Sequence, residues 1–110
     1  MLSEFGGIAY APPDGATWGY SIASDPAELA ERYATLLETV RVIPLFAGFC
    51  YTQFADTYQE ANGLLYADRT PKIPLGEIKL ATRGPRTARE EQAELEWRIR
   101  MMKLWQVVEV

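Results

Sequence analysis

Glu4 is the first residue of the chain whose type and position could support catalysis. It lies in a short, mostly apolar segment, residues 1–5, that ends at Gly6 and Gly7. This pattern predicts a β-strand whose end delivers Glu4 to a loop. Because the chain contains no histidine, a Ser-His-Asp triad and a histidine-based metal site are excluded, and acid–base chemistry falls to carboxylates. Taken alone, a carboxylate beside a glycine turn is a weak signal of catalysis, because surface acids beside turns are common.

A second group of polar residues follows an apolar run farther along the chain. Residues 45–51 are almost continuously apolar, which is typical of a strand covered on both faces in a parallel sheet, and Gln53 and Asp56 come next. A helix is predicted between the two strands, so the order strand, helix, strand predicts a βαβ unit. Since parallel strands end at the same edge of a sheet, we expect Glu4 and residues 53–56 to lie together there.

The helix predicted between these strands has signals at both of its ends. Asp25 is a favourable N-cap, Pro26 suits the first helical position, and Glu28 completes a capping-box pattern three residues after the cap. Pro44 ends the helix by about residue 43. The apolar residues at helical spacing, which predict its buried face, are Leu29, Tyr33, Leu36, Leu37 and Val40.

Two further helices are predicted, a short one over residues 74–81 and a tail helix from residue 87 to about 106. A Gly-Pro step at residues 84–85 separates them. We therefore divide the chain into a main unit, residues 1–82, and a C-terminal helical tail, residues 83–110. Expected features of the tail helix are a capping box of Thr87 and Glu90, the i,i+4 pairs Glu94–Arg98 and Glu96–Arg100, and one apolar face of Leu95, Ile99 and Met102.

The composition excludes several classes of function. A chain of 110 residues, 48% hydrophobic and 24% charged, is typical of one globular core. The net charge of −4 and the scattered basic residues argue against a nucleic-acid partner, because phosphates are bound by clustered Lys and Arg. Cys50 is the single cysteine, so no internal disulfide can form, and we expect it to be a buried small hydrophobe.

The same inventory predicts no membrane partner, no cofactor and no metal site. No apolar run approaches the roughly 18–20 residues that cross a bilayer, and the start of the chain does not resemble a signal peptide. We therefore expect a cytoplasmic location.

Four short motifs follow one another within residues 1–82. They are Ser3-Glu4-Phe5-Gly6, Gln53-Phe54-Ala55-Asp56, Gly63-Leu64-Leu65 and Arg69-Thr70-Pro71-Lys72. In this order and at this spacing they resemble the end of the catalytic barrel of family 2 glycoside hydrolases, the group of β-galactosidases, β-glucuronidases and β-mannosidases. In that family the nucleophilic glutamate ends the seventh strand in a Thr/Ser-Glu-aromatic-Gly setting, and the eighth strand leads into the other three motifs.

The resemblance implies an α/β fold consisting of the last two βα units of a (β/α)8 TIM barrel, strands seven and eight. The predicted C-terminal helix is an addition to this fold, and the resemblance implies nothing about it. The resemblance also implies that Glu4 is the nucleophile of a retaining β-glycosidase that hydrolyses O-glycosidic bonds by double displacement. The substrate would be a β-glycoside, with a β-galactoside as the family-weighted choice. The residues expected to contact the sugar are Trp18, Tyr51, Gln53 and Asp56.

Each of these binding residues also has a structural alternative. Loop aromatics such as Trp18 and Tyr20 stack on sugar rings or simply pack within the loop. Gln53 and Asp56 bond sugar hydroxyls or tie the loop to the rim of the barrel, and for Asp56 we favour the structural role. Lys72 and its neighbour Arg69 are expected to fix the chain as it leaves the active-site face.

The chain also departs from the family pattern. Thr52 stands where many members have a tryptophan that lines the sugar site, and Glu60-Ala61-Asn62 replaces the Asn-x-Lys pair that holds a uronic acid, so a uronic acid substrate is disfavoured. The acid/base glutamate that follows an asparagine in this family has no counterpart here. Eight βα units take about 250 residues. We therefore expect one part of an enzyme, inactive alone, that joins an upstream barrel segment or a second copy; the alternative is a non-catalytic module that self-associates or binds a partner.

Overall fold

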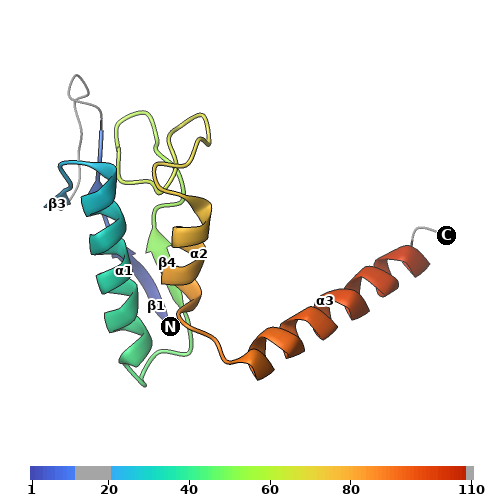
Figure 1. Cartoon of the computed structure of the whole chain (residues 1–110). Helices are drawn as coiled ribbons and strands as arrows, with labels where there is room; N and C mark the ends of the chain where they lie inside the picture. The colour runs from blue at the N-terminus through green and yellow to red at the C-terminus, as the bar shows by residue number, and fades with distance from the viewer. Residues whose placement is uncertain (12–20, 109–110) are drawn as a thin grey trace.

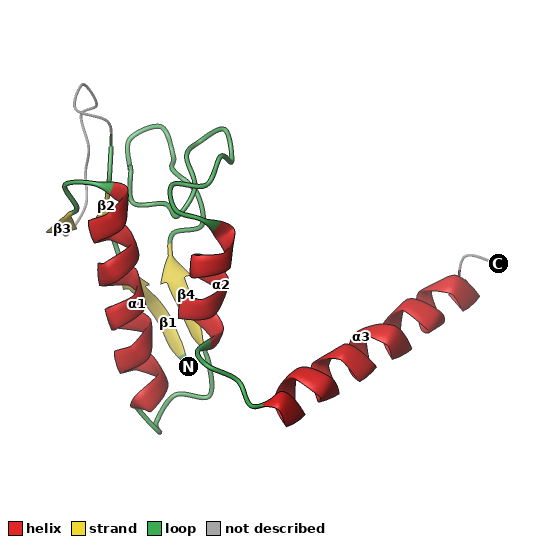
Figure 2. Ribbon diagram, in the orientation of Figure 1, coloured by secondary structure: helices red, strands yellow, loops and turns green. Residues whose placement is uncertain are grey.

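The structure, a computed structural model, describes residues 1–11 and 21–108. A two-stranded parallel sheet is covered on one face by two helices, and a third helix projects away from this body (Figure 1; Figure 2). The elements in chain order are β1 (Leu2–Gly6), β2 (Ile8–Ala9), β3 (Ser21–Ile22), α1 (Pro26–Val42), β4 (Phe49–Thr52), α2 (Leu75–Arg83) and α3 (Ala88–Val108).

The two longer strands, β1 and β4, pair in parallel. Phe5 lies opposite Tyr51 and Gly6 opposite Thr52, with a shift of register between Leu2 and Phe5. Both strands run in the same direction, so Glu4 and the segment that follows β4 lie at the same edge of the sheet. The expected parallel pairing of these strands is confirmed. Each strand has one partner among the described residues, which leaves one edge of β1 and one edge of β4 free.

The main core lies between this sheet and the helices. Tyr33 and Leu37 of α1 are buried against Phe5 and Tyr51 of the strands, and Ile78 of α2 packs at the side. Aromatic rings meet edge to face here: the centroids of Phe5 and Tyr51 are 5.6 Å apart, and those of Tyr33 and Tyr51 are 4.8 Å apart. Successive side chains of a strand point to opposite faces of the sheet, and α1 and α2 pack on one of these faces, so Cys50 lies on a face that neither helix covers. A second core cluster comprises Ile8, Ala23, Leu29 and Ile73.

Helix α1 begins and ends where its sequence predicts. The Asp25 carboxylate accepts a hydrogen bond from the Glu28 backbone N–H at 2.8 Å, and the helix ends ahead of Pro44. The return contact of Glu28 goes to the Ser24 N–H at 2.7 Å, one residue before the cap. Four of the five predicted face residues are buried (Leu29, Tyr33, Leu37 and Val40), and Leu36 is half-buried.

Two expectations about the strands are wrong. The apolar run 45–51 forms a strand only from Phe49 onward, Leu45 is 82% exposed, and Cys50 is exposed rather than buried. The physical reason is that helices cover a single face of the sheet, so half of the apolar strand faces outward. The segment after Gly7, for which we expected only a loop, also contributes a second parallel sheet, in which Ile8 pairs with Ser21 and Ala9 with Ile22.

The C-terminal part differs from expectation in its boundaries. Helix α2 runs to Arg83, so the division we placed after residue 82 falls inside it. Gly84 ends the helix with a φ of 72°, a conformation that glycine adopts without steric cost. The predicted capping box of Thr87 and Glu90 at the start of α3 is confirmed by two reciprocal hydrogen bonds, Glu90 N–H to Thr87 Oγ1 at 3.3 Å and Thr87 N–H to Glu90 Oε2 at 2.8 Å.

The predicted side-chain contacts of α3 are found in part. Glu94 and Arg98 form the expected pair at 2.6 Å. Glu96 instead accepts a hydrogen bond from Gln92, and within the described residues it makes no ion pair with Arg100. The expected apolar face of Leu95, Ile99 and Met102 is exposed.

Within residues 1–11 and 21–108, no helix has the length and apolar character needed to span a membrane.

Candidate functional site

Glu4 lies within β1, two residues before the last residue of the strand, Gly6, and its side chain is exposed. The shift of register between Leu2 and Phe5 falls beside it, and such bulges redirect side chains at the ends of strands. Gly6 and Gly7 follow with φ values of 112° and 70°, so the chain turns away immediately after the carboxylate. A shallow hollow of about 320 Å³ is lined by Glu4, Phe5, Gly6, Gly7 and Thr52.

Close packing holds the two strand ends together around this hollow. The Gly7 N–H donates to the Thr52 carbonyl at 2.9 Å. A Cβ at Gly6 would lie 2.5 Å from Tyr51 Cε2 and 2.8 Å from the Thr52 carbonyl oxygen, so only glycine fits between these groups. The peptide bond between Thr52 and Gln53 is cis. Glu4 is thus held beside the end of β4.

Gln53, an expected sugar ligand, is engaged within the protein. Its Nε2 donates to Asn62 Oδ1 at 2.5 Å, and its backbone carbonyl accepts from the Leu64 N–H at 3.1 Å. Asn62 is buried. The side chain of Gln53 therefore ties the end of β4 to the loop that follows, and it does not line the hollow beside Glu4.

Asp56 binds a buried lysine. One oxygen of its carboxylate, Oδ1, accepts from Lys72 Nζ at 2.7 Å and from the Gly63 N–H at 2.9 Å. The other two hydrogen bonds of Lys72 Nζ go to the carbonyls of Tyr10 and Ala61, at 2.8 and 2.9 Å. Burial lowers the pKa of Lys72, and the neighbouring carboxylate opposes that shift. These contacts agree with the structural role favoured for Asp56.

Tyr51 is not in the hollow with Glu4. Its ring faces α1 and packs against Phe5 and Tyr33 in the main core. Burial, followed by the proximity of Tyr33, raises the pKa of the Tyr51 hydroxyl to about 12. In this arrangement the Tyr51 ring packs in the main core and does not line the hollow beside Glu4. Trp18 and Tyr20 lie outside the described residues.

The hollow supplies a single carboxylate. A retaining glycosidase needs two carboxyl groups about 5–5.5 Å apart, and Glu4 is the one acidic side chain among the described residues that line the hollow. Elsewhere in the described part of the chain, no three His, Cys, Asp or Glu side chains gather in a way that could hold a metal ion. Among the described residues, this hollow therefore offers one carboxylate and no second acid.

The chain has no match among protein-family models or among curated proteins. The resemblance to family 2 glycosidases therefore rests on the four motifs of residues 1–82.

Sequence reasoning missed the contacts that organise the loops after β4. Asn62 and Lys72 are the buried polar residues of the described chain, and each binds a residue of the second motif. Gly63 is also essential to this packing, because a Cβ there would lie 2.3 Å from the backbone of Ala55 and Asp56. A lysine between Pro71 and the apolar Ile73 was the available signal, but it does not reveal the partner of the lysine.

Proposed function

We propose that this chain supplies the nucleophile-bearing part of a retaining β-glycosidase of the family 2 type, with Glu4 as the nucleophile and a β-galactoside as the first substrate to test. The observation that supports this proposal is the position of Glu4 near the carboxyl end of β1, where Thr52, the last residue of the parallel strand β4, lines the same hollow. Active sites at the carboxyl ends of parallel strands are the rule in (β/α)8 barrels.

The uncovered parts of the sheet are consistent with strands seven and eight of such a barrel. One edge of β1 and one edge of β4 have no partner among the described residues, and the sheet face opposite α1 and α2 exposes Cys50. Further strands would pair with these edges and cover this face. The burial would supply association energy at about 25 cal/mol per Å² of apolar surface, before the costs of ordering.

In the proposed mechanism Glu4 attacks the anomeric carbon and forms a glycosyl ester, while a second carboxylic acid protonates the leaving oxygen; water then hydrolyses the ester with the same acid acting as base. The second carboxyl group would come from another βα unit. General acid catalysis is typically worth about 10²–10⁴-fold. We therefore expect no measurable hydrolysis of aryl β-galactosides by the chain alone.

Reconstitution tests the proposal. The chain is mixed with a polypeptide supplying the first six βα units of a family 2 β-galactosidase, and hydrolysis is measured. We expect activity to appear on mixing, to vanish with Glu4→Gln, and to persist with Glu38→Gln, an exposed acid on α1. A fluorinated galactoside that traps the glycosyl enzyme should add its mass to the peptide containing Glu4. Trapping at any other residue of an active complex would refute the assignment.

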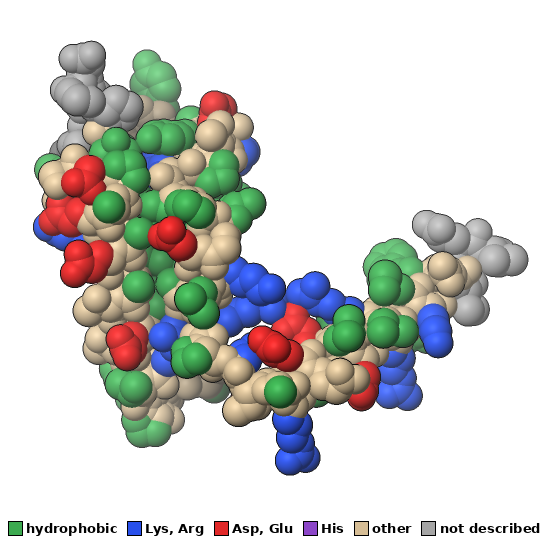
Figure 3. All heavy atoms as spheres, in the orientation of Figure 1, with side chains coloured by type: hydrophobic (Ala, Val, Ile, Leu, Met, Phe, Trp, Pro, Cys, Tyr) green, Lys and Arg blue, Asp and Glu red, His purple; other side chains and the backbone are tan. Residues whose placement is uncertain are grey.

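A second candidate function, a self-associating module without catalytic activity, is favoured by the surface of α3. Large apolar side chains along α3 are exposed, among them Trp97 at 60% and Trp105 at 67%, and Figure 3 shows them on a helix that stands clear of the body. The first half of α3 carries four glutamates and one arginine, whereas residues 98–108 carry two arginines, one lysine and no acid. This asymmetry suits antiparallel pairing with the α3 of a second copy, because opposite charges then face each other.

A further inference from the structure

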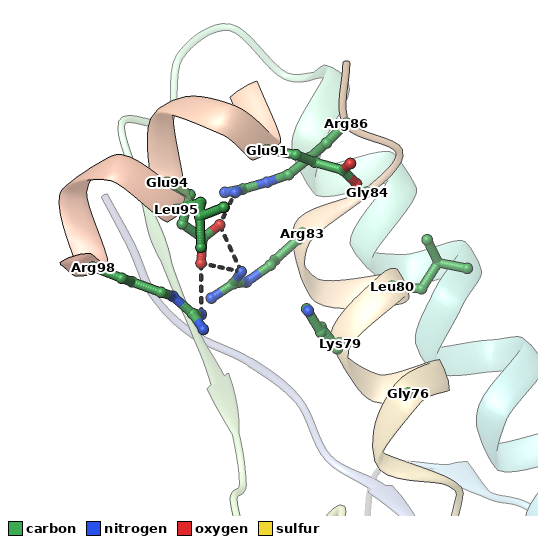
Figure 4. Close-up of a pocket in the computed structure, with 10 residues that line it drawn as sticks. All are labelled: Gly76, Lys79, Leu80, Arg83, Gly84, Arg86, Glu91, Glu94, Leu95 and Arg98. Atoms are coloured by element: carbon green, nitrogen blue, oxygen red, sulfur yellow. Dashed lines mark hydrogen bonds and ion pairs between the residues drawn. The ribbon is translucent and has the colours of Figure 1, made fainter. Parts of the chain in front are cut away.

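A second hollow, between α2 and α3, is lined by more cations than anions. It measures about 450 Å³. Figure 4 shows its basic side chains converging from both helices and from their connection, and in Figure 3 they form a basic patch between the body and α3. The charged residues that line it are Lys79 and Arg83 on α2, Arg86 on the connection, and Glu91, Glu94 and Arg98 on α3.

Glu94 lies at the centre of this cluster. Its carboxylate accepts hydrogen bonds from Arg83 Nη1 at 2.7 and 2.8 Å, from Arg98 Nη2 at 2.6 Å, and from Arg86. The hydrogen bond from Arg83 and the charges of the surrounding arginines lower the pKa of Glu94 to about 2. One carboxylate thus binds three guanidinium groups.

The arginines keep donors that Glu94 does not use. Each binds Glu94 through one terminal nitrogen, and within the described residues the second terminal nitrogen of each makes no hydrogen bond. Lys79 is exposed at the same hollow and forms no ion pair with any described residue. Two carboxylates face four cations, so two positive charges are left without a counter-charge from the lining residues.

We propose that this hollow binds a phosphate group. The free terminal nitrogens of Arg83, Arg86 and Arg98 donate to its oxygens, and Lys79 adds charge. Guanidinium groups match the geometry of phosphate oxygens, and a dianion balances the excess of two positive charges where a carboxylate ligand would leave one. The hollow shares no lining residue with the hollow beside Glu4, so it is separate from Glu4 and independent of the proposed glycosidase function.

Titration of the whole chain with inorganic phosphate, followed by NMR at constant ionic strength, tests the site. We expect saturable binding of one phosphate. Arg83→Ala and Arg86→Ala should each weaken it at least about tenfold, since each removes a charge-assisted hydrogen bond. Arg100→Ala, a matched change on α3 outside the hollow, should change affinity by no more than about twofold. Glu94→Gln should tighten binding, because it removes the competing carboxylate.

Other anions identify what the site recognises. Sulfate should bind comparably to phosphate, and acetate at least about tenfold more weakly. Glycerol phosphate shows whether the natural ligand is a phosphate ester or the free ion. If it binds more tightly than inorganic phosphate, the ligand is an organic phosphate; if it binds more weakly, the ligand is inorganic phosphate. The proposal fails if phosphate binds no more tightly than chloride, or if acetate binds with the same affinity as phosphate. It also fails if the Arg83→Ala/Arg86→Ala variant keeps wild-type affinity for phosphate while circular dichroism shows that its helices are intact.

Discussion

Lys72 is the residue on which the loops beside the candidate site most depend. Its side chain is 0% exposed, its Asp56 partner is 12% exposed, and three acceptors take all three of its ammonium hydrogens. A buried charge is tolerated only when it is paired and hydrogen-bonded. The lysine therefore joins residue 10, which follows β2, to residues 56 and 61 of the loop after β4.

Asp56→Asn should lower the free energy of unfolding by about 3–5 kcal/mol, because it leaves the Lys72 charge buried without its counter-ion. Urea denaturation followed by circular dichroism measures the loss. Asp68→Asn is the control: Asp68 is exposed and accepts a hydrogen bond from the Thr70 N–H that asparagine can keep, so the change should cost less than about 1 kcal/mol. Equal effects of the two substitutions would contradict the structural role of Asp56.

Gly63→Ala should also destabilise the chain, by about 1–3 kcal/mol, because the new methyl group would meet the backbone of Ala55 and Asp56 at 2.3 Å and the loop would have to move. Gly76→Ala is the matched change on α2. A Cβ there meets nothing within 4 Å, and alanine is the better helix former, so stability should rise by about 0.5–1 kcal/mol. Thermal unfolding of the two variants should shift in opposite directions.

At the level of elements, local signals predicted the helices well and the strands less well. Asp25 sets the start of α1 and Pro44 sets its end. Both act through contacts within a few residues, which a sequence reveals directly. The burial of residues 45–51 depends on which elements cover each face of the sheet, and a local sequence pattern does not predict that coverage. The same holds at the site: the position of Glu4 followed from strand order, whereas the Asp56–Lys72 pair joins residues sixteen apart across an irregular loop.

The start of α1 should weaken in acid through Glu28. Hydrogen bonds from the Ser24 hydroxyl and N–H, and then from Arg32, lower the pKa of Glu28 from 4.5 to about 2. A carboxylate whose pKa is lower in the folded state stabilises the fold above pH 4.5 and loses that contribution as the pH falls toward 2. The melting temperature of the wild-type chain should therefore exceed that of Glu28→Gln above pH 5, and the difference should vanish near pH 2.

Glu38→Gln, on the exposed side of the same helix, supplies the comparison. Glu38 accepts no side-chain hydrogen bond within the described residues, so its replacement should leave the pH profile parallel to that of the wild type. A gap between wild type and Glu28→Gln that stays constant from pH 7 to pH 2 would contradict the role of the Glu28 charge.

The whole molecule leaves surface uncovered in two places, the outer face of the sheet and the length of α3. With extents of 50 × 37 × 24 Å it is elongated because α3 extends from the body instead of packing on it (Figure 1). Leu95 lines the hollow toward α2, and Trp97 and Leu104, seven residues apart, share a different face of the helix. Exposed apolar side chains gathered on one face of a helix suit contact with a partner, and the proposed self-association uses this face. The open sheet suits additional strands, whereas α3 suits a second helix.

Self-association of the chain should depend on Trp97 and Leu104. If α3 pairs antiparallel with the α3 of a second copy, sedimentation velocity should show a fraction of dimer that increases with protein concentration. Salt at 0.5 M should weaken the dimer, because the facing charges are exposed. Trp97→Gln/Leu104→Gln should raise the dissociation constant at least about tenfold, since buried aromatic and leucine side chains supply most of such an interface. Leu45→Gln/Leu75→Gln, equally exposed positions on the body, should leave the constant unchanged. A chain that stays monomeric at every concentration removes the support for the self-associating module, and the open sheet edges then favour the glycosidase.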